Sequence, residues 1–229
     1  MAISHDLHCA DLFPVPLVID NFGASARELN RALISDIEQE MAAAPAGAMR
    51  SFVSGWQSPT GLEKKYPSFA ELHRQIEKSA ITYLQHIRFA GPPAARCGGL
   101  WANCMSGRGS HSELHLHGSG QVIATGVYYP ATLAQTGAAL DIDLNRFDPA
   151  TVFTLTGVGG ELVLHDPSYA TKRQIIRPEQ SRYYDAQKLI APRESLLVMF
   201  PHYLPHAVSP LLADGIKRYS ISYAVELGH

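Results

Sequence analysis

The stretch of sequence that decides the fold reads Phe200-Pro201-His202-Tyr203-Leu204-Pro205-His206-Ala207-Val208. Its two prolines favour a turn, and a β-rich run follows over about 205–210. A second β-rich run covers about 217–225, where alternate side chains point to opposite faces. One face is apolar, with Tyr219, Ile221, Tyr223 and Val225, and the other carries Arg218, Ser220, Ser222 and Ala224. We therefore expect two late strands, the second with its apolar face on a core and its arginine directed to the interior of a barrel.

Short β-rich runs separated by Gly and Pro extend upstream from this stretch to about residue 95. Together with the two runs above, the expected strands cover about 97–105, 111–117, 121–129, 160–165, 173–177, 195–200, 205–210 and 217–225. Eight short strands without an internal repeat are typical of a double-sheet jelly roll. Two long connections, about 130–159 and 166–194, have the length of lids or binding loops.

The first 95 residues show a helical pattern instead. Two prolines limit the run 12–20 to an edge strand or an extended segment. One amphipathic helix is expected from about 25 to 43, and another begins after Pro67, with Ser68 as its cap, and continues to about Ile87. In the second helix, Ser68 and Glu71 have the spacing of a capping box. Because each helix is apolar along one face, we expect both to pack on the outward apolar face of a sheet.

These patterns predict a mainly β fold with N-terminal helices, organised as a single domain over 1–229. Residues 1–95 would form a helical support, and residues 96–229 would form the β core. A chain of 229 residues with 46% hydrophobic residues is large enough to bury such a core.

The composition excludes several function classes. A net charge of −2 gives no general electrostatic reason to bind nucleic acid or an anionic membrane. No apolar run approaches membrane-spanning length, and the first residues lack the features of a signal peptide. Cys9, Cys97 and Cys104 match neither a disulfide framework nor a zinc site, so we interpret them as reduced thiols and expect a cytoplasmic protein. Small-molecule chemistry stays open.

His115 and His117 lie two residues apart in a predicted strand. Side chains at positions i and i+2 share one face of a strand, so both imidazoles can bind one metal ion at about 2.0–2.2 Å. The chain has 11 histidines, enough for such a pair to arise by chance, and a solvated or hydrogen-bonded pair is the alternative. Glu113 shares the face of His115 and is an alternative ligand.

His206 opens a late strand, far downstream of that pair. A barrel-like fold can bring two ligands from an early strand and one from a late strand to the same metal, leaving coordination positions open. The alternative is that His202 and His206 only satisfy polar groups of the proline-rich turn. Arg218 would point into the same interior, where a buried cation is costly unless an anion such as a carboxylate meets it. On the alternative reading, Arg218 lies in solvent on an edge strand.

Several motifs occur here in a characteristic order: His115-x-His117, Thr125-Gly-Val-Tyr-Tyr129, Asp166-Pro167, Phe200-Pro-x-x-x-Pro-His206-x-Val and Arg218-x-Ser220. Near the N-terminus, Asp11-Leu-Phe-Pro14 and Gly55-Trp-Gln-Ser58 add two opening elements. In this order the motifs resemble a family of Fe(II)/2-oxoglutarate-dependent oxygenases, mostly bacterial and phage proteins with a double-stranded β-helix (jelly-roll, cupin-like) fold. The resemblance covers most of the chain.

The resemblance implies an enzyme that uses Fe(II), 2-oxoglutarate and O2, and that yields hydroxylated substrate, succinate and carbon dioxide. It implies three iron ligands: His115, His117 and His206. It also implies residues that hold the cosubstrate: Arg218 and Ser220 on the distal carboxylate, Tyr129 on the same carboxylate, and Asn103 beside it. For Asn103, an amide satisfied within the sheet is an equally good reading.

One departure from the wider superfamily concerns the histidine at position 117. The usual facial triad contains two histidines and one carboxylate. Three neutral imidazoles keep the full +2 charge on the metal, as in thiol dioxygenases, which need no 2-oxoglutarate. A three-histidine dioxygenase or hydrolase and a non-catalytic jelly-roll binding module are therefore the alternatives, whereas Arg218 with Ser220 favours use of 2-oxoglutarate.

The segment 166–193 carries six basic residues against three acidic ones. The basic residues are Lys172, Arg173, Arg177, Arg182, Lys188 and Arg193. This excess suggests a small-molecule substrate that is anionic, although a charged loop in solvent is the simpler explanation. We expect no nucleic-acid or membrane partner, and the sequence carries no signal for the oligomeric state.

Overall fold

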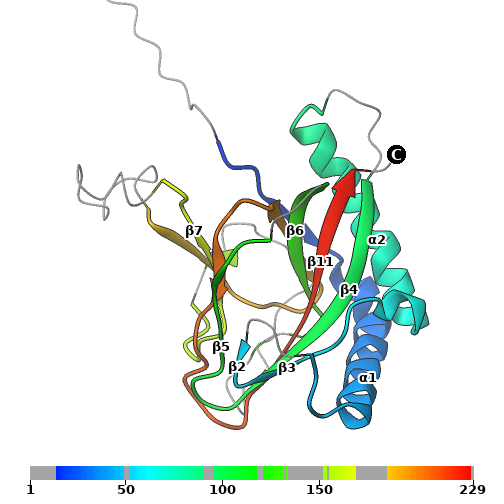
Figure 1. Ribbon diagram of the computed structural model, residues 1–229, viewed down its shortest axis with the longest axis vertical. Coiled ribbons are helices and arrows are strands. Elements are labelled where there is room, and N and C mark those ends of the chain that lie inside the picture. The colour runs from blue at the N-terminus through cyan, green and yellow to red at the C-terminus, as the bar shows by residue number, and fades with distance from the viewer. Residues whose placement is uncertain are drawn as a thin grey trace, which may run out of the picture.

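The computed structural model describes residues 14–48, 52–89, 95–117, 121–131, 133, 152–153, 155–168 and 185–227. Four helices lie in the N-terminal part of the described residues: η1 (Gly23–Ala26), α1 (Arg27–Ala43), η2 (Leu62–Lys64) and α2 (Pro67–His86). Its strands are β1 (Val18–Asn21), β2 (Phe52–Val53), β3 (Gly55–Gln57), β4 (Ala95–Ser106), β5 (His111–His115), β6 (Val122–Tyr129), β7 (Leu162–His165), β8 (Gln187–Ile190), β9 (Leu196–Pro201), β10 (His206–Val208) and β11 (Lys217–Leu227). Figure 1 shows both α-helices on one side of the strands.

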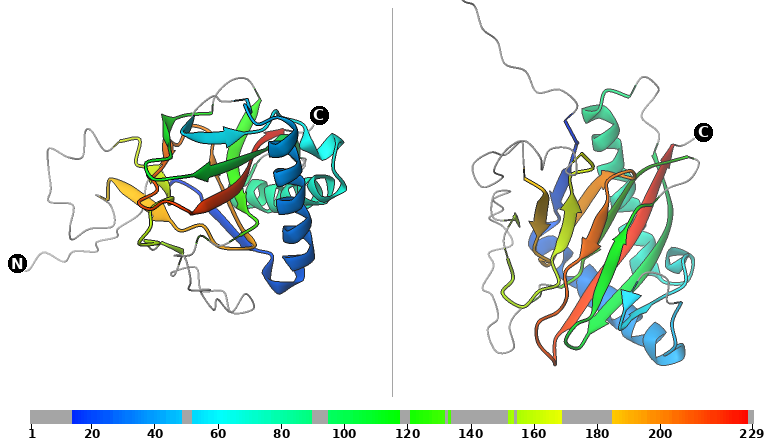
Figure 2. Two further views of the ribbon diagram at one scale, coloured as in Figure 1. Left: turned by 90° about the horizontal axis from the view of Figure 1, so that it is seen from below. Right: turned by 60° about the vertical axis from the view of Figure 1, so that its left-hand side comes forward.

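The strands form two antiparallel sheets. One has six strands in the order β1-β9-β6-β11-β4-β3, and the other has five in the order β2-β5-β10-β7-β8. Neighbours in each sheet are far apart in the sequence, and the two sheets face each other (Figure 2). This arrangement is a double-stranded β-helix, so the predicted mainly β jelly roll supported by two helices is confirmed.

Both α-helices pack on the outer face of the six-stranded sheet (Figure 2). Leu33 and Ile37 of α1 and Phe69 of α2 are fully buried in a core that they share with that sheet. Ile221 and Tyr223 of β11, on the face predicted to be apolar, belong to the same core. Burial of each large apolar side chain contributes roughly 1.5–3 kcal/mol, so this layer is a main source of stability.

The opposite face of the six-stranded sheet looks into the space between the sheets. In the antiparallel register, Arg218 of β11 lies opposite Met105 of β4, and Ser220 lies opposite Asn103. Arg218, Ser220 and Asn103 are at most 2% exposed. The alternation of polar and apolar residues in the sequence therefore predicted correctly that Arg218 and Ser220 lie on the inner face of the sheet.

Three short strands were not predicted from the sequence. β2 and β3 have two and three residues, too few for an alternating pattern to be recognised. β8 lies at the edge of the five-stranded sheet, within a connection expected to be a loop. The strand expected at 173–177, and most of the two long connections, lie outside the described residues.

The helix boundaries agree with the expected ones within a few residues, but the predicted capping box of α2 is wrong. Tyr66 is the N-cap and makes no side-chain cap hydrogen bond, while Pro67 takes the first helical position. The Ser68 hydroxyl instead donates to the carboxylate of Asp36 on α1. Proline at this position needs no amide partner and already has a helical φ, so α2 begins without a capping side chain.

Two further observations bear on the composition. Cys97 and Cys104 are buried free thiols, in agreement with their reading as reduced cysteines. Burial raises their pKa values to about 12 and about 11, respectively, which makes both thiols unreactive at neutral pH. Among the described helices, none combines the length and the apolar character needed to cross a membrane.

The shared core of helices and sheet predicts that the β part depends on its N-terminal support. A fragment covering 96–229 would expose the outer face of the six-stranded sheet, including Ile221 and Tyr223. We expect this fragment to aggregate, or to lose its near-ultraviolet circular dichroism and its cooperative thermal transition. The full chain under the same conditions is the control, and a soluble fragment with cooperative unfolding would contradict this expectation.

Candidate active site

Three histidines from the five-stranded sheet come together at one point. His115 ends β5, His117 follows two residues later, and His206 begins β10 directly opposite His115 in the register. One ring nitrogen of each lies within 4.8 Å of the others. The ring centroid of His206 lies 4.4 Å from that of His115 and 4.9 Å from that of His117. His117 lies two residues beyond the end of β5, outside the assigned strand, and still reaches the cluster.

Backbone hydrogen bonds orient two of these rings. Nδ1 of His115 lies 2.7 Å from the carbonyl oxygen of Glu113, and Nδ1 of His206 lies 2.9 Å from that of Leu204. A carbonyl only accepts, so each Nδ1 donates a proton to it, which leaves Nε2 as the nitrogen available to a metal. Metal-binding histidines are commonly fixed in this way.

The electrostatic state of the cluster also suits a metal. Burial is the main cause that lowers the pKa of His206 to about 3 and that of His117 to about 4, and His115 contributes to both shifts. Both imidazoles are therefore neutral at pH 7, which is the form that binds a metal ion. Three imidazoles with ring nitrogens this close together fit a divalent transition metal such as iron.

Arg218 lies across from this cluster on the six-stranded sheet and is 2% exposed. Its Nε donates to the carbonyl of Gly160 at 2.7 Å, Nη1 to the Ser220 hydroxyl at 3.0 Å, and Nη2 to the Tyr129 hydroxyl at 3.2 Å. Burial lowers the pKa of Arg218, and all three partners are neutral. A buried cation held by neutral groups is suited to bind an anion.

The backbone around Gly160 makes room for this arginine. Gly160 has φ +80°, a conformation that side chains disfavour, and a Cβ there would lie 2.8 Å from Leu133 and 3.2 Å from Cδ of Arg218. Glycine therefore lets the chain pass close enough for its carbonyl to accept from Nε.

A cavity of about 330 Å³ joins the two groups. His115, His117 and His206 line it from the five-stranded sheet, and Arg218 lines it from the six-stranded sheet together with Ser220 and other inward side chains. Trp101 also lines it, with its ring centroid 5.9 Å from that of His117. A molecule in this cavity can therefore meet a cation and a cluster of metal-binding groups at the same time.

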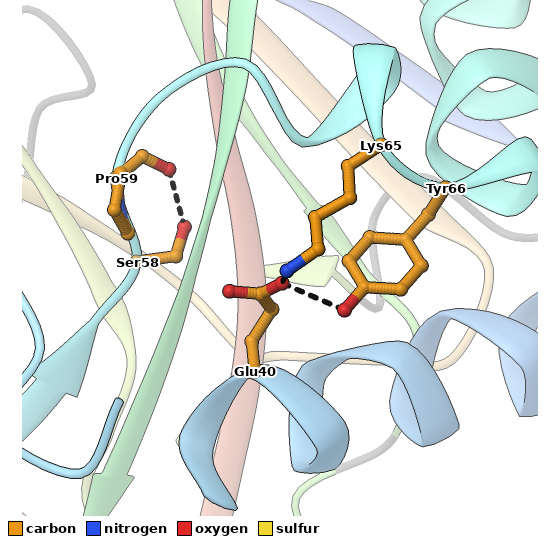
Figure 3. A network of polar contacts seen from close by, with 5 residues as sticks. All are labelled: Glu40, Ser58, Pro59, Lys65 and Tyr66. Carbon is orange, nitrogen blue, oxygen red and sulfur yellow. Dashed lines mark hydrogen bonds and ion pairs between the residues drawn. The ribbon is translucent and has the colours of Figure 1, made fainter. Parts of the chain in front are cut away.

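Ser58, Pro59 and Thr60 form one wall of the cavity, and two separate sets of polar contacts hold the segment to which they belong (Figure 3). Glu40 of α1 is 6% exposed and accepts hydrogen bonds from the ammonium of Lys65 and, at 2.6 Å, from the hydroxyl of Tyr66. The Ser58 hydroxyl donates to the carbonyl of Pro59 and accepts from the amide of Ala102 on β4. These contacts tie the segment between β3 and α2 to α1 and to the sheet.

The cavity is lined by all seven residues that we expected, from the sequence, to bind the metal or the cosubstrate: His115, His117, His206, Arg218, Ser220, Tyr129 and Asn103. Glu113, the alternative ligand, is exposed and lies outside the histidine cluster. His202 also lies outside it, with its Nδ1 3.3 Å from the carbonyl oxygen of Ile123 on β6, so its recorded partner belongs to a neighbouring strand and not to the proline-rich turn.

Two features of the cavity were missed. Gln57 of β3 lines the cavity. It was missed because this strand has only three residues, too few to be predicted from the sequence. Asn103 donates from Nδ2 to Ser222 at 2.9 Å, while its Oδ1 is buried without a partner. The alternative that Asn103 makes its hydrogen bonds within the sheet therefore holds for the Nδ2 group and not for Oδ1.

Comparisons with known proteins add three findings. A model of the family described as "Putative 2OG-Fe(II) oxygenase" matches residues 99–224, which include all seven residues above. A search of curated proteins returned no match. Solved structures share the fold at identities that establish the fold alone.

One of these structures is a prolyl-4-hydroxylase from Pseudomonas putida, with a TM-score of 0.57 at 15% identity, covering 93% of this chain and 92% of that one. HygX from Streptomyces hygroscopicus, with nickel and 2-oxoglutarate bound, has a TM-score of 0.53 at 12% identity over 93% and 83% of the two chains. SnoN, a non-heme alpha-ketoglutarate-dependent epimerase from nogalamycin biosynthesis, has a TM-score of 0.56 at 11% identity over 92% and 76%.

The Glu40 network predicts a pH-dependent contribution to stability. Burial alone would raise the pKa of Glu40, but hydrogen bonds from Lys65 and Tyr66 outweigh it and hold the pKa below its ordinary value. The ionised carboxylate therefore stabilises the fold above the pKa of the unfolded chain, and this stabilisation is lost as pH falls through the lower pKa of the folded state. We expect Glu40→Gln to lower the free energy of unfolding by about 1 kcal/mol at pH 7, because Lys65 is largely exposed and screened.

Urea unfolding of both proteins between pH 7 and pH 3 measures this difference. It should shrink towards zero below about pH 4. Glu28→Gln, at an exposed position in the first turn of α1, is the control and should change stability by less than about 0.5 kcal/mol at every pH. A Glu40→Gln effect that does not depend on pH would mean that the carboxylate charge is not what stabilises this region.

Proposed function

Because the chain belongs to the family of 2OG-Fe(II) oxygenases, enzymes whose cofactors are Fe(II) and 2-oxoglutarate, we propose that it hydroxylates a small molecule bound in the cavity between its sheets. Iron would be held by Nε2 of three histidines: His115, His117 and His206. The distal carboxylate of 2-oxoglutarate would be held by Arg218, Ser220 and Tyr129. Asn103 borders the same pocket one strand further from Arg218 and would face the cosubstrate from the substrate side.

The buried guanidinium of Arg218 is the observation that carries this proposal. Its hydrogen-bonding partners are neutral, and it shares a cavity with three metal-binding imidazoles. A dicarboxylate that chelates a metal at one end matches both features, since its far carboxylate accepts charge-assisted hydrogen bonds from the planar guanidinium. A three-histidine site that worked without 2-oxoglutarate would leave this cation without a use.

In this proposal the protein residues bind the metal and the cosubstrate, orient them, and exclude water from the cavity. Carbonyl contacts hold the Nδ1 proton of His115 and of His206, so that each Nε2 points to the metal position. Tyr129 is fully buried, and burial raises the pKa of its hydroxyl, so it stays protonated and can donate to a carboxylate. Bound iron supplies the oxidising chemistry with oxygen and 2-oxoglutarate, while the walls of the cavity decide which substrate carbon faces it.

The first test is the effect of Arg218→Ala on cosubstrate binding. The substitution removes a buried charge pair from the complex, so we expect a loss on the order of 2–5 kcal/mol, at least thirtyfold in affinity. Iron content should be unchanged, because the arginine lies away from the histidines. The measurement is an anaerobic titration of the iron protein with 2-oxoglutarate, followed by the visible absorption band of the chelate, together with succinate formation in air.

Two further variants make this test specific. Arg218→Lys should recover only part of the affinity, because an ammonium cannot present the planar fork of a guanidinium. Arg108→Ala removes an exposed arginine from the turn after β4 and should bind 2-oxoglutarate like the parent protein. Unchanged affinity in Arg218→Ala, or no chelate band in the parent, would favour a three-histidine oxygenase without this cosubstrate or a non-catalytic binding module.

A further inference from the structure

Two residues that line the cavity each carry a buried side-chain oxygen without a hydrogen-bond partner among the described residues: Oε1 of Gln57 and Oδ1 of Asn103. Gln57 is 7% exposed and Asn103 is 1% exposed. Burial of an acceptor without a donor is costly, and folded proteins rarely leave one unpaired. Two such atoms in one cavity indicate that a ligand supplies the missing donor.

The sheet register puts these two oxygens next to each other. Gln57 of β3 lies directly opposite Asn103 of β4, and Asn103 lies directly opposite Ser220 of β11. Side chains directly opposite on neighbouring strands share a face and lie roughly 5 Å apart. The three therefore form a row that runs from the arginine pocket to the edge strand. Gln57 lies two strand spacings from Ser220, roughly 10 Å, which places it outside the pocket that holds a carboxylate on Arg218.

The chemistry of the row selects the kind of group that binds. Nδ2 of Asn103 already donates to Ser222, so its oxygen is the end left free for a ligand. A carboxylate would be repelled by two acceptor oxygens, whereas an N–H or O–H group would pair with them. Among the described residues that line the cavity, Arg218 is the only lysine, arginine, aspartate or glutamate. A charged group at Gln57 would therefore lack a counter-ion, while the nearby Trp101 and Phe52 offer apolar contact.

We propose that Gln57 and Asn103 bind the substrate through an uncharged group that donates a hydrogen bond, an amide N–H or a hydroxyl, while Trp101 and Phe52 contact its apolar part. This assignment rests on the proposed function, since the bound group belongs to the molecule that is hydroxylated. It differs from the anionic substrate suggested by the basic segment 166–193. Four of the six basic residues of that segment lie outside the described residues, and Lys188 pairs with Asp185.

The test uses three probes of one shape. N-methylbenzamide carries an amide N–H, methyl benzoate has an ester oxygen in its place, and benzoate carries a negative charge. Each is titrated into the Zn(II)-loaded protein saturated with 2-oxoglutarate, which cannot turn over, and binding is followed by saturation-transfer NMR. We expect N-methylbenzamide to bind about tenfold more tightly than methyl benzoate, as one or two added hydrogen bonds imply. Benzoate should bind no better than the ester.

Gln57→Leu should abolish the preference for the amide and leave 2-oxoglutarate affinity unchanged. Its melting temperature should stay the same or rise, because the substitution removes a buried polar atom that has no partner. Gln85→Leu, at an exposed position of α2, is the matched control and should keep the preference for the amide.

Four results would overturn the inference. These are equal or absent binding of the amide and the ester to the parent protein, tighter binding of benzoate, an unchanged preference in Gln57→Leu, and a fall of several degrees in the melting temperature of that variant. The last result would mean that the two amides pair with each other as part of the fold. Failure of the parent protein to bind 2-oxoglutarate at all would instead count against the proposed function and is measured separately in the same samples.

Discussion

The rest of the structure depends on the burial of one cation between two sheets. Arg218 is buried with only neutral partners, and Gly160, Ser220 and Tyr129 hold its guanidinium in place. Keeping a charge there is unfavourable in the free protein, so the fold must supply compensating burial elsewhere. The layer of α1 and α2 on the opposite face of the same sheet supplies it. The stabilising core and the proposed anion site thus lie on the two faces of one strand, β11.

The histidine cluster depends on pairing between distant strands in a similar way. β10 places His206 opposite His115, and backbone carbonyls orient both rings with Nε2 free. Because burial keeps His117 and His206 neutral, these two rings can bind a metal at pH 7 without first losing a proton. The two sheets therefore contribute different chemistry to one cavity: neutral donors for a metal on one side, and a cation with a row of polar groups on the other.

Much of this site could be predicted from the sequence because strand alternation is a local signal. Alternation correctly predicted that Arg218 and Ser220 face inward and that the apolar residues of β11 pack against the helices. The three histidines were identified from the order of the motifs. Other parts depend on pairing between segments that local patterns do not record. Gln57 was missed because β3 is three residues long and is defined by its pairing with β4. The prediction that Ser68 caps α2 was wrong because its hydroxyl donates to Asp36 on the neighbouring helix α1. Local sequence spacing does not reveal a contact of this kind.

The most direct test of this account is a crystal structure of the protein prepared anaerobically with Fe(II) and 2-oxoglutarate, with anomalous scattering measured at the iron edge. The account predicts one iron peak within bonding distance of Nε2 of His115, His117 and His206. It also predicts a cosubstrate carboxylate on the guanidinium of Arg218. An iron peak held by other residues, such as His111 or His202, no peak at the cluster, or a cosubstrate bound away from Arg218 would contradict it.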